Sequence, residues 1–225
     1  MLAENLQKSK QIGILKYYKS KLILVVKMAD RKIYSSTEEI IAPEHSALIV
    51  WDVQNMLVNR IFNKEEFLQN LNKIITAARK ADVPIFFTKI TPLPARFESK
   101  ARLASMKGWG SMSNDKSMFE LAVSPGENEI VINKNTASIF VGTNFELMAR
   151  NAGIETLIFT GISTEIGVES SARDALNRGF YAVIARDAVS SGDKEAHERS
   201  LANMQKLLII TDSAAVEGAW SKLKS

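Results

Sequence analysis

The chain has 225 residues, of which 46% are hydrophobic and 24% charged, so a fibrous or disordered protein is excluded. This length suits one sizeable core rather than two domains. The absence of cysteine excludes disulfides, zinc–thiolate sites and thiol catalysis, and it is compatible with a cytoplasmic protein. No apolar run approaches the roughly 18 residues of a membrane helix, so no membrane partner is expected.

The net charge of +4 is concentrated in the first 32 residues. This segment holds eight basic and two acidic side chains, so it carries +6 and the rest of the chain −2. Because the rest has no basic stripe with interleaved aromatic residues, no nucleic-acid partner is expected.

The first 40 residues are interpreted as a basic extension, followed by one folded domain over residues 41–225. The apolar stretch at residues 22–26 is shorter than the roughly 7–15-residue core of a signal peptide, and no small-residue cleavage site follows it. A targeting or membrane-surface role is the alternative interpretation. Met28 is a second possible start of the protein.

Apolar runs alternate with helical patterns from His45 onward. Strands are predicted at residues 47–51, 83–87, 129–132, 156–160, 181–185 and 207–210, and helices at 65–81, 143–151, 165–177 and 194–206. This alternation predicts an α/β fold with a parallel sheet. The long connection over residues 88–128 is typical of a binding loop or lid.

Candidate catalytic residues follow three of the predicted strands. Asp52 ends the first strand, Lys134 ends the third, and residues 161–164 join the fourth to a helix that contains Gly167. Ligands bind beyond the carboxyl ends of parallel strands, so these residues can share one cleft. Lys134 would favour an ionised Asp52 and an apolar pocket a protonated one, which leaves open whether Asp52 is a base or an acid. Taken singly, each is also explained as a cap or a surface ion pair.

Three segments in this order, residues 47–55, 134–140 and 160–175, resemble the isochorismatase-like family, also called the cysteine hydrolases. The resemblance implies a Rossmann-like three-layer fold with a central, mostly parallel six-stranded sheet flanked by helices. It also implies a hydrolase that acts on a small molecule, and no cofactor is expected. A homo-oligomer, dimer or tetramer, is expected from the same resemblance.

Most members of that family hydrolyse amides through an acyl-thioester on a cysteine, assisted by an aspartate and a lysine. Asp52 and Lys134 match the last two, and Gly167 stands at the position of the cysteine. Glycine offers no nucleophile, but it resembles the true isochorismatases, in which the aspartate is implied to protonate a vinyl ether. We expect the missing side chain at Gly167 to leave room for substrate and its amide to donate to a developing negative charge.

Further site residues are implied by the same resemblance. Substrate contacts are expected from Gln54, Arg102, Trp109, Phe140, Ile162 and Ser163, with a solvated loop arginine as the alternative for Arg102. The hydroxyls near Gly167 are expected to shape the loop or to pack within the helix (Ser163, Thr164, Ser170, Ser171). The only histidines, His45 and His197, are isolated in the sequence, so no metal site is predicted.

Two functions stay open at this point. The first is hydrolysis of a small metabolite by activated water, at a vinyl ether or an amide. The second is a catalytically inactive member that acts as a small-molecule binding or scaffold protein. Residues 169–174 resemble the amidohydrolase branch, including ureidoacrylate and carbamoyl-type hydrolases. The presence of both Asp52 and Lys134 favours the enzyme.

Overall fold

The structure, a computed structural model, describes residues 33–91, 93–106 and 115–222. The chain divides into two compact units, Met1–Ser35 and Ser36–Ser225, and every element below belongs to the second. Trp109, one of the expected substrate contacts, lies outside the described residues.

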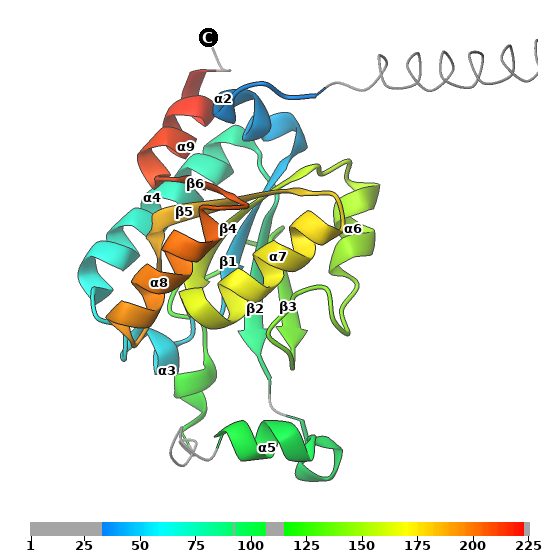
Figure 1. The fold of residues 1–225 in the computed structure, drawn as a ribbon, viewed down its shortest axis with the longest axis vertical. Helices are drawn as coiled ribbons and strands as arrows, with labels where there is room; N and C mark the ends of the chain where they lie inside the picture. Colours follow the sequence, from blue (N-terminus) through cyan, green and yellow to red (C-terminus); the bar gives the residue numbers. More distant parts are fainter. Residues whose placement is uncertain (1–32, 92, 107–114, 223–225) are drawn as a thin grey trace, which may run out of the picture. The chain divides into compact units, whose positions relative to one another are not determined.

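The second unit is built on a six-stranded sheet in which all neighbouring strands are parallel, which confirms the predicted α/β fold (Figure 1). The strand order is β3-β2-β1-β4-β5-β6, so the order reverses between β1 and β4. Sites in such sheets lie at the carboxyl ends of the strands beside this reversal. The strands are β1 Ser46–Trp51, β2 Ile85–Ile90, β3 Ile130–Lys134, β4 Thr156–Ile162, β5 Tyr181–Ser190 and β6 Ile209–Thr211.

Helices cover both faces of the sheet and form two apolar cores (Figure 1). One core contains α6 Phe145–Asn151, α7 Glu169–Asn177 and α8 Lys194–Met204, and the other contains α4 Lys64–Ala81 and α9 Ser213–Ser221. Successive side chains of a strand point to opposite faces. In β1, Ile49 and Trp51 therefore enter the first core and Leu48 and Val50 the second, which explains its uninterrupted apolar sequence.

Several short elements were not predicted. They are α2 Thr37–Ile40, α3 Asn55–Val58 and α5 Lys100–Met106, with 3-10 turns at Pro43–His45, Ala95–Phe97 and Lys116–Phe119. The helix α9 was also missed, although Asp212 caps it by accepting a hydrogen bond from the Ala215 amide at 2.8 Å. Val216 and Trp220 of α9 are buried against α4. No helix in the described ranges combines the length and apolarity needed to cross a membrane.

Two predicted boundaries changed near the carboxyl edge of the sheet. The helix predicted at residues 165–177 begins as a π-helical turn over Thr164–Val168, and α7 follows it. The strand β2 continues to Ile90 rather than ending at residue 87, which places Thr88 inside the sheet. A single π turn inside a helix is often found at a functional site.

Candidate active site

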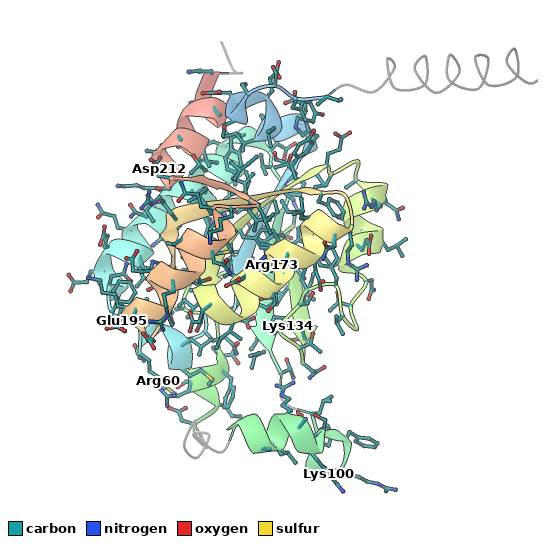
Figure 2. The ribbon with its side chains drawn as sticks, viewed as in Figure 1. Arg60, Lys100, Lys134, Arg173, Glu195 and Asp212 are labelled. Carbon is teal, nitrogen blue, oxygen red and sulfur yellow. The ribbon has the colours of Figure 1, made fainter. Side chains whose placement is uncertain are left out.

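The carboxyl ends of β1, β2 and β3 bring three polar side chains together. Asp52 follows β1, Thr88 lies in β2, and Lys134 is the last residue of β3. Figure 2 shows Lys134 at the lower end of the sheet, on the side where α5 lies. The sequence predicted the approach of Asp52 and Lys134, whereas Thr88 was missed because the predicted second strand ended at residue 87, three residues before the end of β2.

Asp52 and Lys134 form a buried ion pair. The Lys134 Nζ lies 2.6 Å from Asp52 Oδ2, and both side chains are nearly inaccessible to solvent. The Thr88 hydroxyl donates to Asp52 Oδ1 at 2.5 Å and accepts from the Asp52 amide at 3.0 Å. Lys134 also donates to the Thr136 carbonyl oxygen at 3.1 Å. Both carboxylate oxygens and the ammonium group are therefore fixed in position.

Burial shifts the pKa values of both partners toward their neutral forms. It raises the pKa of Asp52, although the charge and hydrogen bond of Lys134 and the hydrogen bond of Thr88 act in the opposite direction. Burial likewise lowers the pKa of Lys134 against the attraction of Asp52, and the positive charge of Arg102 lowers it further. A carboxyl group with a raised pKa binds a proton more readily than an ordinary aspartate, as a group that accepts and returns protons must.

The backbone at Asp52 is in a left-handed conformation, with φ of 47°. Few residues other than glycine adopt this region, and such conformations persist where the surrounding structure holds them. Here the Asp52 carbonyl accepts from the Gln54 amide at 2.7 Å, while Thr88 holds the Asp52 amide. The aspartate is thus oriented through its main chain as well as its side chain.

The space that a side chain at Gly167 would take is filled by Trp51, so this geometry does not support the expectation that the glycine leaves room for substrate. A Cβ atom on Gly167 would lie 2.0 Å from Trp51 Nε1 and 2.3 Å from Cε2. Trp51 is 1% exposed, and Lys134 Nζ lies 3.9 Å from the centre of its ring, a cation–π distance. Sequence reasoning missed this role because Trp51 read only as the last apolar residue of a buried strand.

The side chain of Gln54, an expected substrate contact, forms hydrogen bonds with main-chain atoms. Its Nε2 donates to the carbonyl oxygens of Phe119 at 2.7 Å and Ile90 at 3.3 Å, and its Oε1 accepts from the Ile90 amide at 2.8 Å. These contacts use both amide protons of a fully buried side chain. Gln54 therefore joins the end of β1 to β2 and to the segment before Leu121.

Phe140 also packs in the protein interior rather than beside Asp52. Its ring contacts those of Phe145 and Phe180 at centroid distances of 5.2 Å and 5.9 Å. These rings belong to the core between the sheet and the helices α6 to α8. An expected contact from Phe140 to substrate thus has no support in this geometry.

The loop after β4 and the helix α5 hold the remaining expected contacts. Ile162 is buried, Ser163 is partly exposed, and the peptide bond between them is cis. Arg102 lies in α5 with its guanidinium 3.5 Å from Glu98, and its charge acts on Lys134 as described above. These three residues stay candidates for contacting a substrate.

The hydroxyl groups around Gly167 have structural partners. Ser170 donates to the Ile166 carbonyl oxygen, Ser171 accepts from the Ile139 amide, and Thr164 donates to the Ser190 carbonyl oxygen. Thr164 also lies 2.8 Å from Nδ1 of His197. These contacts agree with the expectation that the hydroxyls shape the loop and the helix.

In the described part of the chain, neither a metal cluster nor the hollow near the amino-terminal edge of the sheet coincides with this site. The described ranges contain no group of three or more His, Cys, Asp or Glu side chains placed to hold a metal ion. A hollow of ≈ 520 Å³ lies at the amino-terminal edge of the sheet, opposite the ion pair, and is lined by residues such as Pro43, Pro84, Ile154 and Trp220. The chemistry of the ion pair, rather than a cavity, therefore defines the candidate site.

Comparison with known proteins agrees with this geometry. Residues 46–215 match the isochorismatase domain. The chain is 30% identical to the isochorismatase family protein YecD of Escherichia coli O157:H7, over 69% of this chain and 85% of that protein. It is 27% identical to the ureidoacrylate amidohydrolase RutB of Pseudomonas syringae pv. syringae, over 72% and 78% of the two chains.

The fold is similar to that of a cysteine hydrolase from Pseudomonas syringae pv. phaseolicola, with a TM-score of 0.74 at 18% identity over 86% and 99% of the two chains. A parallel α/β sheet with an acid–lysine pair at its carboxyl edge thus defines the class of protein. The chain belongs to the isochorismatase family, and the relatives that it resembles include the amidohydrolase RutB.

Proposed function

We propose that this protein hydrolyses an amide-type bond of a small carboxylated metabolite by direct attack of water, without a covalent enzyme intermediate. The observation that carries the proposal is the buried Asp52–Lys134 pair beside a Gly167 that bears no nucleophile. RutB, to which the chain is similar, is named for the hydrolysis of ureidoacrylate, a molecule of this kind. No cysteine exists anywhere in the chain to form a thioester.

Each residue has a defined part in the proposed reaction. Asp52 accepts a proton from water as the water oxygen bonds to the carbonyl carbon, and it returns that proton to the leaving nitrogen as the carbon–nitrogen bond breaks. Lys134 offsets the negative charge of Asp52 before the proton arrives. Arg102 lies near enough to influence Lys134, and it is proposed to attract the substrate carboxylate.

The decisive experiment compares wild-type protein with Asp52→Asn on ureidoacrylate, N-carbamoyl amino acids, isochorismate and nicotinamide. Turnover of an amide substrate that falls at least about 1000-fold in Asp52→Asn supports the proposal. Turnover of isochorismate alone would instead assign Asp52 as the acid of vinyl-ether hydrolysis. Activity that survives in a folded Asp52→Asn protein would contradict any catalytic role for the pair.

A reagent control identifies contaminating enzymes. Iodoacetamide alkylates catalytic thiolates, but the present chain contains no thiol. The measured rate should therefore be unchanged after treatment with iodoacetamide. A loss of rate would show that the activity comes from another protein.

The second candidate is a small-molecule binding protein without turnover, and the position of Trp51 favours it. The indole occupies the space beside Gly167 that a substrate would otherwise enter. Calorimetric binding of a screened compound without any hydrolysis, abolished in Asp52→Asn, would support this function over the first.

A further inference from the structure

The indole of Trp51 occupies the space that a side chain on Gly167 would need. The three Trp51 atoms nearest to a Cβ on Gly167 are Nε1, Cε2 and Cζ2, at 2.0, 2.3 and 2.6 Å. All three lie on the nitrogen edge of the indole. Distances below 3.0 Å are essentially never found for real Cβ atoms, so the two positions cannot both be occupied. Any side chain at position 167 would have to displace the indole.

The indole is held firmly in that place. Trp51 is 1% exposed, belongs to the core under α7, and lies under the ammonium group of Lys134 at 3.9 Å. It cannot move away from Gly167 without breaking the cation–π contact and opening the core. The fit with Gly167 is therefore a property of the packed core rather than of one mobile side chain.

The indole N–H has no acceptor among the described residues, although a buried tryptophan usually finds one. Ser46 Oγ and Glu165 Oε2 are the completely buried side-chain polar atoms without a partner in the described part of the chain. The nitrogen edge of the indole lies against Gly167, and Lys134 Nζ lies 3.9 Å from the centre of the ring. The unused N–H is therefore placed at the candidate site.

We propose that Trp51 stands in the place of the missing nucleophile: its indole fills the space of a side chain at position 167 and presents its N–H to the substrate or to the attacking water. An N–H group can bind an oxygen lone pair but cannot form an acyl intermediate. The part of this inference that concerns a substrate rests on the proposed function. The packing of the indole and its free N–H can be tested without any turnover.

The first test is the thermal stability of Gly167→Ala in two backgrounds. In the wild-type background the added methyl group collides with the indole, and Tm falls by about 5 °C or more. In a Trp51→Leu background the same substitution changes Tm by less than about 2 °C. Because Trp51→Leu removes a large buried side chain, Trp51→Phe provides a second, milder background.

Gly218→Ala is the matched control for added bulk. Gly218 also lies in a helix, α9, and a Cβ there meets no atom within 4 Å. This substitution should leave Tm unchanged or raise it, because alanine is the better helix former. An equal loss of Tm from Gly167→Ala with and without Trp51 would overturn the claim that the indole takes the place of the side chain.

The second test is hydrogen exchange of the indole N–H groups, followed by NMR in D2O. Trp220 is the internal control, because its Nε1 donates to the Ile41 carbonyl oxygen at 2.7 Å in a comparably buried place. The chain has three tryptophans, so single Trp→Phe variants assign the three signals. The Trp51 proton should exchange at least about 10-fold faster than that of Trp220.

Equal protection of the two protons would overturn the proposal, since it would show that the protein itself binds the Trp51 N–H. Neither test measures hydrolysis, so both stay decisive if every compound of the screen is inert. Conversely, a positive result in both with no hydrolysis would contradict the proposed function alone.

Discussion

The contacts of Asp52 and Lys134 explain how two charged groups are tolerated in the interior. Removing an ion from water costs several kcal/mol unless a partner and hydrogen bonds compensate for it. Lys134 has the Asp52 carboxylate, the Thr136 carbonyl oxygen and the Trp51 ring as partners, and Asp52 has Lys134 and Thr88. Each member of the pair is thus the principal reason that the other can be buried.

A double-mutant cycle should show this dependence. Asp52→Asn or Lys134→Met alone leaves one buried charge without its partner and is expected to lower the free energy of unfolding by about 3 kcal/mol. The double variant removes both charges and should lose less than the sum of the single changes by about 1 kcal/mol or more. Urea denaturation gives the free energy of unfolding of the wild type and the three variants. Strict additivity would show that the two side chains do not stabilise one another.

Gln54 gives a second prediction at the level of single residues. Because its amide joins the main chain at Ile90 and Phe119, Gln54→Ala should lower stability by about 2 kcal/mol through loss of these buried bonds. Gln54→Glu keeps the shape but replaces the donor atoms, and it should be equally harmful. A substitution that raised KM without changing the free energy of unfolding would instead restore Gln54 as a substrate contact.

At the level of elements, α8 is joined to the π-helical turn by a buried histidine. Thr164 gives its proton to the Ser190 carbonyl oxygen, so its oxygen accepts from the Nδ1–H of His197, at 2.8 Å. Burial lowers the pKa of His197 below its ordinary value of 6.5, against the attraction of Glu198 and Glu165. A protonated ring could make the same contact, so it is the burial of His197, rather than this hydrogen bond, that favours the neutral ring.

The pH dependence of stability follows from this shift. Below about pH 6.5 the unfolded chain binds a proton at His197 that the folded chain binds more weakly, so stability falls as the pH falls. His197→Asn should reduce the slope of unfolding free energy between about pH 7 and about pH 5. Glu195→Gln, at an exposed position on the same helix, is the control and should leave the slope unchanged. An unaltered slope in His197→Asn would contradict the assignment.

At the level of the whole molecule, the edge strand β3 exposes apolar side chains. Ile130 and Val131 are each 41% exposed, and Leu147 of α6 is 63% exposed. An apolar sheet edge tends to pair with another chain. We therefore propose that a second copy covers this edge in a homo-oligomer.

The oligomer proposal is tested by light scattering after gel filtration. Val131→Lys places a charge in the proposed interface and should convert the oligomer to a smaller species with unchanged secondary structure. Leu207→Lys is the control, because Leu207 is 62% exposed but follows α8 rather than β3. A monomeric wild-type protein, or an unchanged mass in Val131→Lys, would contradict the proposal.

The sequence alone determined the order and type of the main elements and the approach of Asp52 to Lys134. The reason is local: apolar runs and helical spacing define each element, and parallel strands place their ends at one edge. The absence of a nucleophile at Gly167 was also visible directly in the sequence.

Only the tertiary structure decided how the site is filled. The contact between Trp51 and Gly167, the bonds of Thr88 to Asp52 and those of Gln54 to Phe119 join residues far apart in the chain. They depend on strand register, on the exact end of each strand and on side-chain rotamers, which local patterns do not encode. For this reason Gly167, at which an open pocket was expected, lies instead against the indole of Trp51 at the end of β1.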